Sequence, residues 1–228
     1  MLLNWENIPD KIKNDCVRNY YNILAKKRKQ LIIKRIFDLS FSLILCIIAA
    51  PIILLIAILI KCTSKGSVFF KQNRVTQYGE VFRIFKFRTM HQKTETSSVH
   101  ITAENDSRIT KLGQVLRKFR LDEIPQLFNI VAGQMSFVGT RPEVLKYVDH
   151  YTDEMKASLL MPAGLTSLAS IKFKDESKLL SGHNIEQTYF QKILPEKMKY
   201  NLLYIEQFNL LYDIKLMLKT VFSVIKIN

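Results

Sequence analysis

The sequence predicts an α+β fold class: a mainly helical, membrane-associated domain with a short β-hairpin and interfacial amphipathic helices. The first observation is an uncharged run of 22 residues at positions 39–60. At about 1.5 Å per residue, a helix of this length reaches across a hydrocarbon core of about 30 Å. The second is apolar residues at helical spacing on both sides of this run. The third is an alternating pattern over residues 67–90, which predicts the hairpin.

The composition limits the class of partner. The chain has 228 residues, which favours one domain, and its 34 Lys and Arg against 20 Asp and Glu give a net charge of +14. This charge predicts an anionic partner: nucleic acid, anionic lipid or a phosphorylated small molecule. Cys16, Cys46 and Cys62 show no Cys-x-x-Cys spacing, so neither a disulfide framework nor a zinc site is indicated. A reducing cytoplasmic location is favoured.

The apolar run, expected as a helix over about residues 37–61, is basic on both flanks. A basic block lies within residues 26–35, and Lys61 and Lys65 follow the run. Segments that flank a membrane helix on the cytoplasmic side usually carry an excess of Lys and Arg. Both flanks of this run fit that tendency if both lie in the cytoplasm. Pro51 removes an amide donor and bends the helix. The residues alone leave two alternatives open: a re-entrant helix kinked at Pro51, and a single kinked span.

Further elements follow from local patterns. Residues 10–29 predict an interfacial helix that ends in the basic block KKRK, whereas residues 198–225 fit a core helix and a headgroup helix equally well. Residues 94–105 are polar without a period and predict a loop. Residues 109–128 predict a helix, interrupted just before Pro125 because a proline disfavours the α conformation of the preceding residue.

Adjacent acidic residues occur three times, and one pair has a setting that favours chemistry. The pairs at 153–154 and 175–176 have structural explanations, as an expected helix start and a lysine-rich polar stretch. Asp122 and Glu123 follow a cluster of cations that includes Arg117 and precede an apolar run. Carboxylates there stay ionised yet partly shielded from water. Glycine-rich phosphate loops are missing, so side-chain cations would have to bind phosphate.

A series of motifs extends over most of the chain. In order, these are KRIFD at 34–38, the apolar run broken at Pro51, VFFKQNRV, FRIFKFRTM, and NDSRITKLGQVLRKFRLDEIPQLFNIVAGQMSFVGTRPE at 105–143. This order closely resembles the monotopic polyprenyl-phosphate phosphoglycosyl transferases, also called bacterial sugar transferases. The most specific stretch is R-x-x-x-L-D-E-x-P-Q-L-x-N at 117–129. The resemblance implies a single phosphoglycosyl transferase domain over residues 34–228, preceded by an N-terminal amphipathic extension over residues 1–33.

The resemblance also implies an activity. The enzyme would transfer a phosphosugar from a UDP-sugar to polyprenyl (undecaprenyl) phosphate and release UMP, as the first membrane step of bacterial glycoconjugate assembly. Asp122 would be the nucleophile that forms a covalent aspartyl phosphosugar intermediate. Mg²⁺ would be held by Asp122 and the donor diphosphate, and Glu123 would help place the metal or assist the acceptor. The implied phosphate-binding cations are Lys86, Arg88, Arg117 and Arg141.

A location and a set of partners are implied in the same way. The helix kinked at Pro51 would be re-entrant, at the cytoplasmic face of the bacterial inner membrane. The partners would be a UDP-sugar, polyprenyl phosphate and membrane lipid, without nucleic acid, and a homodimer stays open.

The chain departs from the family pattern at three places. Ala50 precedes Pro51 where the family often has serine, so no hydroxyl is available to satisfy a freed backbone group. Thr140 replaces the first proline of G-P-R-P, which keeps Arg141. The segment PAGLTSLASIKFK at 162–174 lacks the usual later glycine and arginine, which puts donor recognition by this segment in doubt.

A non-enzymatic alternative also remains open. A basic membrane-anchored module could bind anionic lipid or nucleic acid, with Asp122 and Glu123 inert. The net charge and the amphipathic segments favour this alternative as well. It does not account for the joint occurrence of the patterns at 117–129 and 135–143.

Overall fold

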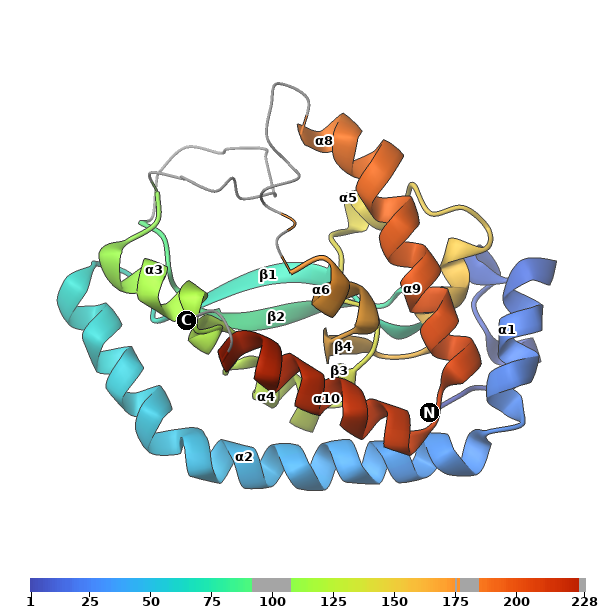
Figure 1. The fold of residues 1–228 in the computed structure, drawn as a ribbon, viewed down its shortest axis with the longest axis horizontal. Helices are drawn as coiled ribbons and strands as arrows, with labels where there is room; N and C mark the ends of the chain where they lie inside the picture. Colours follow the sequence, from blue (N-terminus) through green and yellow to red (C-terminus); the bar gives the residue numbers. More distant parts are fainter. Residues whose placement is uncertain (92–107, 175, 177–184, 226–228) are drawn as a thin grey trace.

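A long bent helix, α2 (Arg28–Thr63), runs along one side of the molecule, and the other elements pack around it (Figure 1). The computed structural model describes residues 1–91, 108–174, 176 and 185–225. The loop expected over residues 94–105 lies outside the described residues. The described part is mainly helical and contains a two-stranded antiparallel sheet, which confirms the mainly helical α+β class with its hairpin and long apolar helix.

Helix α2 is longer than the helix expected over residues 37–61, because the basic residues from Arg28 onward are also helical. Pro51 lies inside α2, and Figure 1 shows the helix as two arms that meet at a bend, as expected where a proline interrupts the backbone hydrogen bonds. Many apolar side chains of α2 are exposed, and Ile47 is 75% exposed. The helix is long and apolar enough to cross a membrane. Apolar exposure on this scale indicates membrane association.

The N-terminal residues fold against the domain. Two short 3-10 turns, η1 (Trp5–Asn7) and η2 (Asp10–Ile12), lead into α1 (Asp15–Ala25). Val17, Tyr21 and Leu24 share one face of α1 and are buried in the main core. That face packs on η5 (Met155–Leu160) and α9 (Leu194–Gln207). The helix predicted over residues 10–29 is confirmed for residues 15–25, but its interfacial placement is wrong, because protein and not lipid covers its apolar face.

The predicted hairpin is confirmed. It consists of β1 (Phe69–Val75) and β2 (Val81–Phe87), joined by the turn η3 (Gln77–Gly79). The strands are antiparallel, with Phe69 opposite Phe87. At the turn, the Tyr78 hydroxyl accepts a hydrogen bond from Leu3 N at 2.8 Å and donates one to Met1 O at 3.1 Å. The N-terminal arm thus holds the tip of the hairpin.

A second pair of strands was not expected from the sequence. β3 (Met135–Val138) and β4 (Ala163–Thr166) are parallel, and β3 is fully buried. Beyond β3, the backbone of Gly139 lies directly against Gly164, so a Cβ added to Gly164 would lie 2.1 Å from Gly139 N. This close approach requires glycine. It also fixes the start of the segment that carries Arg141.

The helix expected over residues 109–128 is broken twice. Its pieces are α3 (Lys111–Lys118), the 3-10 turn η4 (Leu121–Glu123) and α4 (Gln126–Val131). The break before Pro125 is confirmed, but its expected cause is wrong, because Ile124 keeps the α conformation with φ of -52° and ψ of -40°. The second break is at Arg120, which has a left-handed conformation with φ of 56° and was not foreseen. The two breaks isolate Asp122 and Glu123 in a short turn of their own.

The C-terminal part consists of short helices followed by two longer ones. The elements are α5 (Leu145–Val148), α6 (Leu168–Lys172), α8 (Ile185–Thr188), the π-helix η6 (Tyr189–Ile193), α9 and α10 (Leu210–Ile225). The stretch at 198–225 is therefore two helices. α9 buries Met198 and Ile205 in the core, whereas α10 exposes 78% of Leu211 and 62% of Phe222. α9 is thus a core helix, whereas α10 leaves large apolar side chains exposed, and its predicted placement at the lipid headgroups stays a prediction.

A buried ion pair joins the first arm of α2 to α10. Lys34 Nζ lies 2.6 Å from Asp213 Oδ2 and 3.8 Å from Asp38 Oδ2, and these side chains are at most 5% exposed. The Tyr204 hydroxyl donates to the other Asp213 oxygen at 2.8 Å. Asp38 in turn accepts a hydrogen bond from Phe137 N in β3 at 3.4 Å. The apolar helix is therefore anchored to the domain by buried charges.

Replacing Lys34 by methionine should destabilise the fold by about 3–5 kcal/mol, because two buried carboxylates lose their cation. Chemical unfolding of the purified protein in detergent measures this loss. The matched control is Lys199→Met, which breaks the exposed pair of Lys199 with Glu196, worth about 0–1 kcal/mol. Equal effects of the two substitutions would contradict a structural role for the buried pair.

Candidate active site

Asp122 and Glu123 lie in the turn η4, between α3 and α4. The left-handed Arg120 ends the preceding helix and redirects the chain, and Pro125 is the N-cap of α4. The side chain of Asn129 in α4 donates to one backbone carbonyl of β2 at 2.8 Å and accepts from a backbone N–H of β2 at 3.0 Å. η4 is thereby held against the hairpin. Asp122 and Glu123 are only 7% and 8% exposed.

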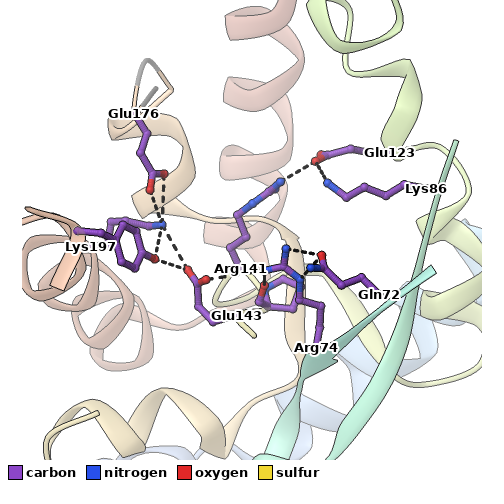
Figure 2. A network of polar contacts seen from close by, with 10 residues as sticks. Gln72, Arg74, Lys86, Glu123, Arg141, Glu143, Glu176 and Lys197 are labelled. Atoms are coloured by element: carbon purple, nitrogen blue, oxygen red, sulfur yellow. Dashed lines mark hydrogen bonds and ion pairs between the residues drawn. The ribbon is translucent and has the colours of Figure 1, made fainter. Parts of the chain in front are cut away.

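Glu123 gathers cations from three parts of the chain. Its Oε1 accepts hydrogen bonds from Lys86 Nζ at 2.8 Å and Arg141 Nη2 at 2.6 Å (Figure 2). Arg120 Nη1 lies 3.9 Å from the same oxygen. Burial alone would raise the pKa of Glu123, but Arg141, Lys86 and Arg120 outweigh burial and hold the pKa well below its usual value. Glu123 therefore stays ionised, and Glu123 in turn raises the pKa of Arg141.

Asp122 has a different environment from its neighbour. Its Oδ1 is buried and has no hydrogen-bond partner among the described residues. Burial raises the pKa of Asp122, and the adjacent Glu123 charge raises it further, against the opposing effect of Lys86, Arg117 and Arg120. A buried carboxylate oxygen without a partner among the described residues is costly, so Asp122 is a candidate for a group that binds a ligand or takes part in chemistry.

The other two cations named from the sequence have different contacts. Arg117 Nε donates to Thr89 Oγ1 at 2.9 Å, and its charge acts on Asp122. Arg88 donates from Nη2 to the carbonyl and the hydroxyl of Ser64, both at 2.8 Å, at the C-terminal end of α2. Its Nε and Nη1 are buried without a partner in the described part of the chain. Lys86, Arg117 and Arg141 thus surround the acidic pair, whereas Arg88 binds the end of the apolar helix.

The donor set fits a metal that arrives with a phosphate ligand. Residues 1–91, 108–174, 176 and 185–225 contain no group of three or more His, Cys, Asp or Glu side chains that could hold a metal. Mg²⁺, however, usually binds one or two carboxylates together with substrate phosphates. The unpaired Oδ1 of Asp122 is a donor of this kind.

Four residues beside the site were missed by the sequence reasoning. The Glu143 carboxylate lies 3.4 Å from Lys197 Nζ and 3.8 Å from Arg74 Nη1 (Figure 2). It also accepts a hydrogen bond from the Tyr189 hydroxyl at 2.6 Å. Arg74 and Glu143 belong to the motifs VFFKQNRV and TRPE, which could have drawn attention to them. Tyr189 and Lys197 lie far along the chain and carry no such signal. Glu176, which the sequence placed in a lysine-rich polar stretch, pairs with Lys197 Nζ at 3.3 Å.

Replacing Asp122 by asparagine should stabilise the folded protein at pH 7. A folded-state pKa raised above the usual value of about 3.9 means that ionisation of Asp122 disfavours the folded state, by about 1.4 kcal/mol per pKa unit. The gain should shrink as the pH falls, since Asp122 itself becomes neutral. Unfolding of Asp122→Asn and of the exposed-site control Asp153→Asn between pH 4 and pH 8 tests this. A destabilised Asp122→Asn at pH 7 would contradict the expectation.

Comparisons with known proteins give the family. Residues 29–227 match the family model described as bacterial sugar transferase. The chain is 35% identical over 196 residues to a UDP-glucose:undecaprenyl-phosphate glucose-1-phosphate transferase of Klebsiella pneumoniae, covering 85% of this chain and 40% of that protein. It is 31% identical over 201 residues to a UDP-N-acetylgalactosamine-undecaprenyl-phosphate N-acetylgalactosaminephosphotransferase of Aeromonas hydrophila, covering 85% and 44%.

A third relative is covered over more of its length. It is a UDP-glucose:undecaprenyl-phosphate glucose-1-phosphate transferase of Caulobacter vibrioides, 33% identical over 195 residues, with 84% of this chain and 69% of that protein covered. The chain spans less than half the length of the Klebsiella and Aeromonas relatives. The match to the family model nevertheless includes α2, the hairpin, the acidic pair and the cations around it. The chain therefore belongs to the bacterial sugar transferase family.

Proposed function

We propose that this chain is a phosphoglycosyl transferase that moves a phosphosugar from a UDP-sugar to polyprenyl phosphate through a covalent intermediate on Asp122. The observation that carries the proposal is the contrast within the buried pair: Lys86 and Arg141 donate hydrogen bonds to Glu123, whereas Oδ1 of Asp122 has no partner among the described residues. The Klebsiella and Aeromonas relatives are named for activities that use a UDP-sugar and undecaprenyl phosphate, which supports the same substrate classes here.

In the first step, a carboxylate oxygen of Asp122 attacks the β-phosphorus of the donor. A new P–O bond forms the acyl phosphate that carries the sugar. The bond from this phosphorus to the bridging oxygen breaks, and UMP leaves with that oxygen and the electron pair. The raised pKa of Asp122 makes its carboxylate more basic than that of an ordinary aspartate, which favours nucleophilic attack.

In the second step, a phosphate oxygen of polyprenyl phosphate attacks the same phosphorus. The acyl P–O bond breaks, the lipid carries away the phosphosugar, and the carboxylate of Asp122 is regenerated. Division into two steps suits one substrate that arrives from water and another that arrives from lipid.

The surrounding cations fit the charge that develops in both steps. Lys86 and Arg141 are preorganised by Glu123, and Arg117 acts on Asp122 itself. Fixed positive charges at the transferring phosphoryl group are the main protein contribution to such reactions. Arg88 stays a proposed phosphate-binding residue, because its Nε and Nη1 have no partner in the part of the chain that the structure describes. Bound Mg²⁺, held by Asp122 and the donor diphosphate, would neutralise charge on the departing UMP.

We also propose that α2 is a re-entrant helix that enters the membrane from its cytoplasmic face and returns to it. The two ends of α2 lead into α1 and β1. Val17 and Leu24 of α1 belong to the same hydrophobic cluster as Val75 of β1 and Tyr78 of the hairpin turn. A single membrane span would place these residues on opposite sides of the bilayer, so their common core supports the re-entrant alternative. The exposed apolar residues of α10 would then face the same leaflet.

Incubation with the donor sugar and Mg²⁺, without lipid acceptor, should release about one UMP per active site and add one phosphosugar mass to the protein. UDP-glucose and UDP-N-acetylgalactosamine are the first donors to test, given the relatives. Asp122→Asn should lose both signals because an amide is a poor nucleophile, whereas Asp153→Asn should keep both. If UMP is released only when the lipid is present and no adduct forms, the two-step mechanism is wrong and the transfer is direct. Binding of lipid or nucleic acid without any UMP release would favour the non-enzymatic alternative.

The topology can be tested with the chain's own cysteines. Cys16 in α1 and Cys62 near the end of α2 are free and exposed. Two variants, each with a single cysteine at position 16 or 62, should both resist a membrane-impermeant maleimide in intact spheroplasts. Both should react after permeabilisation. Labelling of one cysteine from outside, with the other protected, would require a single span.

A further inference from the structure

The segment that carries Arg141 is fixed at the next two residues. Arg74 Nη1 donates to Pro142 O at 3.1 Å, and Val75 N donates to Glu143 O at 2.9 Å. The end of β1 therefore pairs with the backbone that follows Arg141. Figure 2 shows the side chains of Arg141 and Glu143 directed to different partners, Arg141 to Glu123 and Glu143 toward Lys197. Glu143 also accepts a hydrogen bond from the Tyr189 hydroxyl.

The Glu143 carboxylate is held by side chains from distant elements. It is 8% exposed and lies within reach of Tyr189 at 2.6 Å, Lys197 at 3.4 Å and Arg74 at 3.8 Å. We call these four residues the Glu143 clamp. Burial and Glu143 raise the pKa of Tyr189, so its hydroxyl remains a donor at neutral pH. The shortest of the three contacts is thus a hydrogen bond to a charged acceptor, the stronger class of such bonds.

Each arm of the clamp is itself held in place. Arg74 donates from Nη2 and Nε to Gln72 Oε1 at 2.7 and 3.1 Å. Lys197 Nζ donates to both oxygens of Glu176 at 3.3 Å. Tyr189 opens the π-helix η6, a rare conformation that is found frequently at functional sites. All of these contacts serve to hold one buried carboxylate, that of Glu143. A turn at the protein surface would not need side chains held in this way.

We propose that Glu143 is a positioning residue for the transfer reaction: the Glu143 clamp fixes the segment at 140–144 so that Arg141 presents its guanidinium to the donor diphosphate beside Glu123. This inference rests on the proposed function, in which Arg141 binds phosphate. The contact with Glu123 is the main cause of the raised pKa of Arg141, and the negative charges of Glu143 and Glu176 raise this pKa further. A displacement of about 1 Å at such a group costs about a hundredfold in rate.

Tyr189→Phe tests the clamp with the least disturbance, because it removes one hydroxyl and keeps the ring. It should lower kcat/KM for the UDP-sugar about tenfold, mostly through a higher KM. Tyr147→Phe is the matched control. Tyr147 is buried against Tyr189, with ring centroids 5.0 Å apart, and its hydroxyl has no partner in the described part of the chain. Its removal should leave kcat/KM unchanged.

A double-mutant cycle separates positioning from general stability. If the clamp acts through Arg141, then Tyr189→Phe should cost much less in an Arg141→Lys background, where the planar guanidinium is already lost. If Tyr189 only stabilises the fold, the two losses should multiply. Multiplying losses, or a Tyr189→Phe enzyme with unchanged kcat/KM, would overturn the inference.

The affinity for UDP, measured by calorimetry with Mg²⁺, gives a readout that does not depend on transfer. Tyr189→Phe should weaken UDP binding about tenfold, and Tyr147→Phe should not. If the wild-type protein binds UDP but releases no UMP from any UDP-sugar, the proposed function is wrong. The UDP affinity of Tyr189→Phe then still tests the clamp. If wild type and Tyr189→Phe bind UDP with equal affinity, only the inference about the clamp is wrong. If the wild-type protein does not bind UDP, both the proposed function and the clamp inference are wrong.

Discussion

The arrangement of the site depends on one physical constraint: a buried carboxylate must be compensated by cations. Glu123 meets this constraint by binding Lys86 from the hairpin and Arg141 from the segment after β3. Without such partners, burial would favour the protonated acid. The same pairing therefore holds three separate segments together and leaves the adjacent Asp122 with an oxygen that no described residue satisfies. Glu123 thus contributes ion pairs that hold the segments together, whereas Asp122 is the residue for which we propose reactivity.

Much of this arrangement could be predicted from the sequence, because its signals are local. The 22-residue uncharged run, Pro51 and the alternating pattern before Met90 predict α2, its bend and the hairpin. The cations before Asp122 and the proline after Glu123 likewise indicate a polar turn beside an apolar helix, as observed. Each of these patterns reports on residues within a few turns of one another.

The remainder depends on contacts between distant residues. Periodicity shows that α1 is amphipathic but not what covers its apolar face, which is why protein and lipid could not be told apart. The parallel pairing of β3 with β4 joins short segments about 25 residues apart and has no local pattern. The Glu143 clamp, similarly, joins Arg74 to Lys197, and no spacing rule connects them. The left-handed Arg120 is set by the packing around η4 and not by its own residue type.

The buried pair of Lys34 and Asp213 has a mechanical consequence for the membrane. It joins the two helices with exposed apolar faces, α2 and α10, through side chains that cannot separate without leaving charge unpaired in the interior. In the proposed membrane topology, both faces would enter the lipid together, as one wedge. When bilayer thickness varies, the surrounding acyl chains must deform and not the wedge. The height of the acidic pair above the headgroups would thus be a constant of the protein, independent of the lipid around it.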